Sequence, residues 1–186
     1  QSLLAQYDGA HNLVDAILFC TQSSDHILPP NACILHKRLN LSENVFSLDF
    51  NLGCSGFIYG LGIAQGLIGS GIAKNILLVM ADTYSKYIHK GDRSARVLFG
   101  DGAAVSWIVE SESDRGIVDI QCATSGKGHE SFIIPAGACR LPKSSETSIA
   151  QKDTSNNIRT PENIHMDGMG VLIFVKSKVP KQIMSI

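Results

Sequence analysis

The sequence predicts an α/β layered fold, in which helices cover a largely parallel sheet. Short apolar runs rich in branched residues alternate along the chain with segments that fit a helix. These runs are apolar without a break, as strands are when both faces of a parallel sheet are buried. Strand–helix–strand order of this kind is typical of α/β architectures.

The first three expected elements are a strand, a helix and a second strand. Residues 14–20 (VDAILFC) form the first apolar run. The segment 29–31 (PPN) opens a helix through about Leu39, because proline suits the first helical turn. Residues 45–50 (VFSLDF) form the next strand.

A long helix is expected from about residue 56 to residue 71. The segment is apolar nearly all round, which predicts burial at the centre of the molecule despite a cost of about 1 kcal/mol per glycine. Small residues recur at intervals of four and form a face that another backbone can approach closely. They are Gly56, Gly60 and Ala64, with Gly62 and Gly66 as a second set.

A third buried strand and a polar loop follow this helix. Residues 76–82 (ILLVMAD) are the strand, and residues 84–96 are the loop. Residues 97–99 and 103–110 flank Gly100-Asp101-Gly102, which is the pattern of two strands around a tight turn.

The remaining third of the chain is less regular. Residues 117–122 alternate in polarity and predict a further strand. From about residue 126 to residue 161 the chain is polar and predicts an irregular surface excursion. A helical pattern resumes over 167–186, and we expect Pro180 to bend or end that helix.

The composition limits the classes of partner that this chain can bind through its overall charge or hydrophobicity. Sixteen basic residues and 17 acidic ones leave a net charge of −1, so no sequence-wide field attracts nucleic acid or an acidic membrane. The apolar stretches are too short to span a bilayer. The chain begins with Gln1 and ends at Ile186 inside a helical pattern, so we expect a piece of a longer protein.

Cysteine usage favours a reducing cytoplasm. The five cysteines are an odd number without C-x-x-C spacing, which argues against a disulfide framework or a zinc ribbon. The six histidines show no metal-ligand spacing either, so we expect no metal site.

Cys54 is the first candidate for chemistry. It follows a strand, lies in a Gly-Cys-Ser-Gly turn and precedes a long helix. Backbone N–H groups and the helix dipole favour a thiolate there, and such a thiolate can attack an acyl thioester. The alternative is a buried structural cysteine. We expect the other four to be inert: Cys20, Cys33, Cys122 and Cys139.

The loop 84–96 is the second candidate. It carries four basic residues: Lys86, Lys90, Arg93 and Arg96. The simplest interpretation is a solvated surface, and the sharper one is a contact for the phosphates of a nucleotide-bearing substrate. Neither glycine-rich phosphate-loop motif follows any expected strand.

Several motifs together resemble one known family. Residues 49–61 (DFNLGCSGFIYGL) look like the nucleophile segment of the β-ketoacyl-acyl-carrier-protein synthase III family. Residues 92–94 (DRS) and 98–104 (LFGDGAA) resemble its following motifs at matching spacing. Residues 21–30 and 164–168 also fit, so the resemblance runs over nearly all of the chain.

The resemblance implies the thiolase fold, which has two similar α/β halves and usually forms a homodimer. Residues 1–186 would be one partial domain, namely the nucleophile-bearing N-terminal half plus the start of the second half. The implied substrates are acyl-CoA and malonyl-acyl carrier protein, without a cofactor, in cytoplasmic fatty acid biosynthesis. Cys54 would take the starter acyl group, and a carbanion from malonyl decarboxylation would then attack it.

The same resemblance implies roles for three further residues. Phe99 corresponds to a wall of the acyl pocket, and Leu28 to a residue that reaches the pocket of the partner subunit. Arg93 matches an arginine that lies against the CoA nucleotide. The backbone N–H of Cys54 would be one oxyanion donor.

The chain also departs from the family pattern. The family's catalytic His and Asn are expected beyond residue 186, and His165 matches neither motif. Met169 stands where relatives commonly carry a polar residue near the pantetheine arm. Two alternatives therefore stay open: a related starter-unit acyltransferase or polyketide-type synthase, and a non-catalytic fragment that only binds partners.

Overall fold

The computed structural model describes residues 3–6, 9–113 and 116–185, and the chain divides into two compact units. The first unit comprises residues 1–82 and 102–122, and the second comprises residues 83–101 and 123–186. In the part of the chain that is described, no helix is long and apolar enough to cross a membrane.

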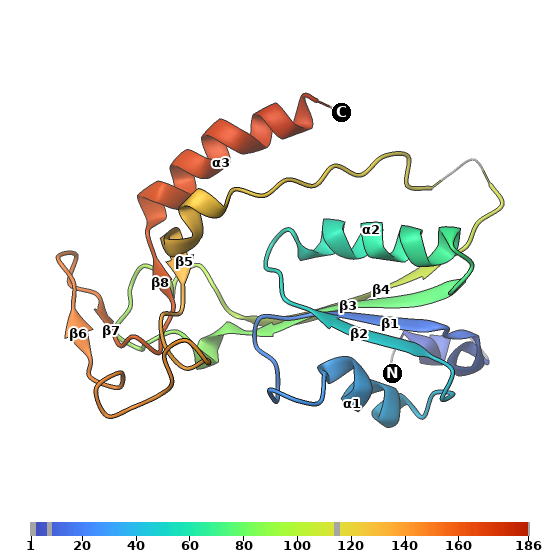
Figure 1. The fold of residues 1–186 in the computed structure, drawn as a ribbon, viewed down its shortest axis with the longest axis horizontal. Helices are drawn as coiled ribbons and strands as arrows, with labels where there is room; N and C mark the ends of the chain where they lie inside the picture. The colour runs from blue at the N-terminus through green and yellow to red at the C-terminus, as the bar shows by residue number, and fades with distance from the viewer. Residues whose placement is uncertain (1–2, 7–8, 114–115, 186) are drawn as a thin grey trace. The chain divides into compact units, whose positions relative to one another are not determined.

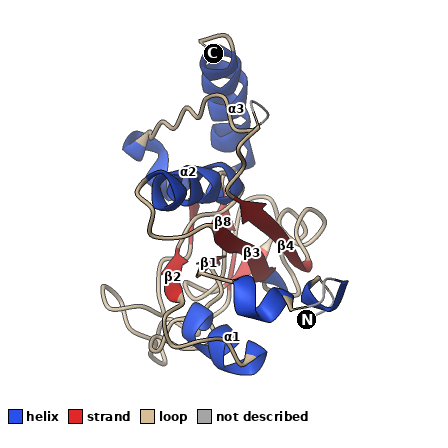
Figure 2. Ribbon diagram, turned by 90° about the vertical axis from the view of Figure 1, so that its right-hand side faces the viewer, coloured by secondary structure: helices blue, strands red, loops and turns tan. Residues whose placement is uncertain are grey.

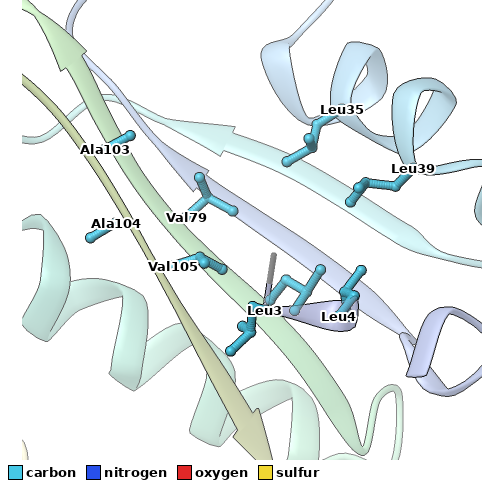
Figure 3. A pocket seen from close by; sticks show the side chains of 9 residues that line it. Leu3, Leu4, Leu35, Leu39, Val79, Ala103, Ala104 and Val105 are labelled. Carbon is cyan, nitrogen blue, oxygen red and sulfur yellow. The ribbon is translucent and has the colours of Figure 1, made fainter. Parts of the chain in front are cut away.

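A four-stranded sheet forms the centre of the first unit (Figure 1). Its spatial order is β2-β1-β3-β4, and β1 pairs in parallel with both β2 and β3. Leu18 of β1 lies opposite Leu48 and Leu78 in the two neighbouring strands. β4 runs in the opposite direction to β3 (Figure 3). The strands are β1 Ala16–Cys20, β2 Phe46–Phe50, β3 Asn75–Thr83 and β4 Asp101–Val109.

Two helices cover opposite faces of this sheet (Figures 1 and 2). α1 (Asn31–Leu39) connects β1 to β2, and α2 (Gly56–Gly69) connects β2 to β3. The first connection moves one strand along the sheet and the second moves back past β1. Because crossovers between parallel strands are right-handed, reversing the direction puts the second helix on the other face. The predicted α/β fold is therefore confirmed.

The core of the first unit has two apolar layers, one on each side of the sheet. All five residues of β1 are buried. Ile17 and Phe19 pack in the layer beneath α1, together with Leu39. Ala16 and Leu18 point the other way and pack in the layer beneath α2. This alternation explains why the central strand is apolar without a break in the sequence.

The small-residue face of α2 is where helix and sheet meet. Gly60 leaves no room for a side chain, since a Cβ there would lie 2.5 Å from a methyl carbon of Leu78. A Cβ on Gly56 would overlap the sulfur of Cys20. The opposite face of α2 is open, with Phe57 and Ile58 exposed, so the expected burial on all sides is wrong for the described structure.

The second unit consists of short elements and one long helix. α3 (Gly168–Ile183) begins at Asp167, whose carboxylate accepts the N–H groups of Met169 and Gly170. Ile164 is one of the few buried apolar residues in this unit. The short elements here are η3 Tyr84–Lys86, η4 Gly126–Ser131, β5 Phe132–Ile133, β6 Gln151–Lys152, β7 Ile158–Arg159 and β8 His165–Met166; the first unit also contains η1 Leu4–Gln6 and η2 Ala10–Leu13.

Three expected elements differ in the structure. Residues 97–99 form no strand, because the N–H groups of Leu98 and Phe99 both donate to the carbonyl of Ala95 in a helical turn. β4 instead begins at the supposed tight turn and pairs with β3. Residues 117–122 form no strand either, since no described strand pairs with them. α3 continues past Pro180 to Ile183, so of the two expected effects of the proline the end of the helix is wrong, and the bend stays a prediction.

Candidate active site

Cys54 lies in the turn between the carboxyl end of β2 and the start of α2. The N–H of Gly56 donates to the carbonyl of Gly53 at 2.8 Å and closes this turn. Ser55 caps the helix without a side-chain hydrogen bond, and the Cys54 side chain is exposed. In open α/β sheets, ligands bind beyond the carboxyl ends of strands whose connections leave on opposite faces, as those after β1 and β2 do here. The thiol is therefore accessible at the edge where such a sheet binds its ligand.

Cys20 is a second thiol close to the start of α2, and its environment is the opposite. It is buried, and its Sγ–H donates to the carbonyl of Leu52 at 3.0 Å. Burial raises the pKa of the Cys20 thiol. This thiol packs against Gly56 and supports the start of the helix, so Cys20 fits the predicted inert role.

Asp49 organises the other helix of this unit. It lies in β2, and its two carboxylate oxygens accept the N–H groups of Asn31 and Ala32 at 2.6 Å and 2.7 Å. A carboxylate at a helix N-terminus satisfies otherwise unpaired N–H groups and interacts favourably with the helix dipole. Sequence reasoning missed this cap; the signal available was an acidic residue inside an apolar strand, which needs a partner.

Asp82 also accepts hydrogen bonds with its carboxylate, in this case from the loop after β1. Its Oδ1 accepts the N–H of Gln22 at 2.7 Å and the hydroxyls of Thr21 and Ser23 at 3.2 Å and 3.1 Å. The loop that carries Leu28 is thereby attached to the end of β3. The Leu28 side chain is 78% exposed, so the surface needed for a contact with a partner subunit is present. The contact itself stays a prediction.

Phe99 belongs to the second unit, where it is held in an aromatic cluster. Its ring centroid lies 5.4 Å from that of Tyr84 in an edge-on arrangement and 5.5 Å from that of Phe132. Nearby, Asp101 accepts the hydroxyl and the N–H of Ser85 at 2.7 Å and 2.9 Å. These hydrogen bonds lower the pKa of Asp101. Phe99 is thus fixed by ring contacts, and its role in an acyl pocket stays a prediction.

Arg93 is exposed, and its guanidinium makes no ion pair with any residue that the structure describes. Its backbone is nevertheless fixed, because its N–H donates to Oδ1 of Asn157 at 3.1 Å. The other basic residues of the loop, Lys86, Lys90 and Arg96, are also exposed. An unpaired guanidinium on a fixed backbone is chemically suited to bind phosphate.

A cavity of about 250 Å³ lies on the α1 side of the sheet in the first unit (Figure 3). Its wall combines side chains of α1, β3 and β4 with Leu3 and Leu4. All of the lining residues are apolar, so this cavity holds no group that could act as an acid, a base or a nucleophile. Among the described residues, no three His, Cys, Asp or Glu side chains group as metal ligands would.

Comparison with known proteins shows which family the chain resembles. Residues 48–126 match the family model of 3-oxoacyl-[acyl-carrier-protein] synthase III. The chain is 38% identical over 161 residues to the β-ketoacyl-[acyl-carrier-protein] synthase III of Caldanaerobacter subterraneus, which aligns 87% of this chain with 46% of that protein. It is 36% identical over 169 residues to the enzyme of that name from Fusobacterium nucleatum, with 90% and 48% aligned.

Solved structures agree with the sequence comparison. A crystal structure of a 3-oxoacyl-(acyl-carrier-protein) synthase III superposes with a TM-score of 0.93 at 40% identity, covering 99% of this chain and 55% of that one. The corresponding synthase of Burkholderia xenovorans gives a TM-score of 0.83 at 32% identity, covering 98% and 50%. The chain spans about half the length of the curated relatives it matches. In sequence and in its thiolase-like fold, the chain therefore matches about half of the length of 3-oxoacyl-[acyl-carrier-protein] synthase III proteins.

Proposed function

We propose that this chain carries the nucleophile of a β-ketoacyl-[acyl-carrier-protein] synthase III that acts in fatty acid biosynthesis. The observation that supports this most directly is the exposed thiol of Cys54 at the start of α2, inside the segment that matches the family model. The named relatives are enzymes of this type.

In the proposed first step, the Cys54 thiolate attacks the carbonyl carbon of an acyl-CoA. The carbonyl becomes a tetrahedral oxyanion, to which the N–H of Cys54 itself would donate one hydrogen bond. Collapse of this intermediate expels the thiolate of CoA and leaves the acyl group on Cys54. Placing the acyl group on the enzyme divides the transfer into two easier reactions.

In the proposed second step, malonyl-acyl carrier protein loses carbon dioxide and becomes a carbanion. The carbanion attacks the acyl-enzyme carbonyl, forms the new carbon–carbon bond and releases Cys54 as a thiolate. The family resemblance implies a His and an Asn that would act in this step.

The remaining assignments are part of the same proposal. Arg93 would bind the phosphates of CoA, Phe99 would border the acyl chain, and Leu28 would reach the partner subunit of a homodimer. What supports them is the exposed Arg93 guanidinium, which makes no ion pair with a described residue, together with the ring contacts of Phe99 and the exposure of Leu28. The enzyme would work in the cytoplasm without a cofactor.

The complete gene product tests this function. Given acetyl-CoA and malonyl-acyl carrier protein, it should form the 3-oxoacyl product, and Cys54→Ala should abolish that product. The matched control is Cys33→Ala, which removes another exposed thiol from α1 and should leave the rate unchanged. Product formation by Cys54→Ala at the wild-type rate would refute the proposal. Acylation without condensation would point to a starter-unit acyltransferase instead.

A further inference from the structure

Two arginines of the second unit contrast sharply. Arg93 is exposed and has no ion pair among the described residues, whereas the side chain of Arg159 is only 12% exposed. Nε of Arg159 donates to Oδ2 of Asp92 at 2.7 Å, and its Nη2 donates to the hydroxyl of Ser94 at 2.9 Å. Its Nη2 also lies 3.5 Å from Oδ2 of Asp153. The guanidinium of Arg159 therefore binds groups within the fold, while that of Arg93 is exposed and can bind a ligand.

The partner of Arg159 is completely buried. Oδ1 of Asp92 accepts the N–H and the hydroxyl of Ser94 at 2.9 Å and 2.7 Å, and the N–H of Ala95 at 3.1 Å. Burial alone would raise the pKa of Asp92, but these hydrogen bonds and that from Arg159 hold it below its usual value. The carboxylate is thus ionised, and its hydrogen bonds come from Ser94 and Ala95, which follow Arg93, and from Arg159.

A second set of contacts reaches residues 91–93 from Asn157 and Ile158. The N–H of Arg93 donates to the side chain of Asn157, whose own N–H donates to Asp153 at 2.8 Å. The N–H of Ile158 donates to the carbonyl of Gly91 at 3.2 Å. Residues 91–95 are therefore attached to β7 and the turn before it by hydrogen bonds of both backbone and side chains.

We propose that Arg159 is a positioning residue, whose bridge between Asp92 and Ser94 fixes the backbone that presents Arg93 to the phosphates of the CoA nucleotide. The role rests on the proposed function. The planar guanidinium is needed because it reaches Asp92 and Ser94 with different nitrogens, which a single ammonium group does not reproduce. Arg159 itself does not touch the substrate.

The test uses two substrates that differ only in the nucleotide. With the complete gene product, we compare Arg159→Lys with wild type on acetyl-CoA and on acetyl-pantetheine, which lacks the phosphates. KM for acetyl-CoA should rise roughly tenfold, the equivalent of one charge-assisted hydrogen bond, while kcat and the acetyl-pantetheine reaction stay unchanged. Because unfolding would impair both substrates, this split separates positioning from a structural defect.

Two further variants complete the design. Ser94→Ala removes the bridging hydroxyl without removing a charge, and should raise the same KM by a smaller factor. Lys143→Gln is the matched control, because the exposed Lys143 side chain forms an ion pair with Glu162 in the same unit, away from Asp92 and Ser94. It should leave both KM values unchanged.

The outcomes separate the two proposals. Equal losses on both substrates in Arg159→Lys, or no change on either, would overturn the positioning role. If wild type transfers no acetyl group at all, the proposed function fails, and the affinity for CoA measured by calorimetry then decides the positioning role. Weaker CoA binding by Arg159→Lys but not by Lys143→Gln would support it, and equal or absent binding would refute it.

Discussion

The two units of the chain are stabilised by different means. In the first, strands and helices bury two continuous apolar layers around β1. In the second, a buried aspartate and the arginine paired with it lie at the centre of a network that ties residues 91–95 to β7. Apolar burial is non-directional and tolerates repacking, whereas a buried ion pair depends on each of its partners. The candidate nucleophile lies on the first kind of structure and the candidate phosphate contact on the second.

The largest effect should come from the apolar layers. Leu18→Ala removes a fully buried side chain from the central strand, and we expect it to lower the free energy of unfolding by about 4 kcal/mol through lost burial and a residual cavity. Urea denaturation measures this. The same truncation at the exposed Leu172 of α3 should cost about 0.5 kcal/mol or less. Equal costs at the two sites would contradict the assignment of the core.

Breaking the ion pair should have the next largest effect. Arg159→Met leaves the buried carboxylate of Asp92 without its cation, and we expect a loss of about 3 kcal/mol confined to the second unit. Hydrogen exchange should show faster opening of amides 91–95 and unchanged protection in β1. A uniform loss across both units would show that the network is not local.

A smaller effect is expected where α2 approaches the sheet. Gly56→Ala places a methyl group against the Cys20 sulfur, and the overpacking should cost about 2 kcal/mol. Gly66→Ala is the matched control in the same helix, because nothing lies within 4 Å of its Cβ position. This control should gain about 0.5–1 kcal/mol from helix propensity. Thermal unfolding compares the two, and stabilisation by both would refute the close approach.

The smallest expected effect is a difference between the two units in their stability at acidic pH. Hydrogen bonds hold the pKa values of Asp92, Asp101 and Asp153 below their ordinary value of 3.8, all in the second unit. The ionised carboxylates stabilise the folded state fully when the pH is above the pKa that they have in the unfolded chain. This stabilisation is lost as the pH falls through the lower pKa values of the folded state. Ordinary carboxyl groups have pKa values of about 4, so the effect should appear as the pH is lowered from about 5 to about 3. Over this range, local opening of the second unit should become faster at a higher pH than local opening of the first unit. Opening in the reverse order would contradict this.

Sequence patterns predicted the first unit well, because its elements are determined by burial. The apolar runs around β1, β2 and β3 appear in the structure, and the set Gly56, Gly60 and Ala64 of α2 packs against the sheet as expected. The second expected set is not packed in this way, because Gly66 has open space around its Cβ position. The pattern failed around residue 100, where Gly-Asp-Gly resembles a turn but begins β4. The strand partner there is β3, which local periodicity does not reveal.

The candidate site was predictable only in part. The turn around Cys54 follows from its glycines and its place between a strand and a helix. The Asp49 cap and the Asp92–Arg159 pair were missed, since they join residues far apart in the chain. Only the fold brings such polar partners together. An isolated acidic residue in the sequence indicates that a partner exists but does not identify it.

The central claim is that Cys54, and no other cysteine of this chain, accepts an acyl group from CoA. The most direct measurement is peptide mapping by mass spectrometry after the complete gene product has reacted with acetyl-CoA. Acetyl groups should be found on the Cys54 peptide alone, and the exposed thiols of Cys33, Cys122 and Cys139 serve as internal controls. An unmodified Cys54, or equal acetylation of the four exposed thiols, would contradict the account.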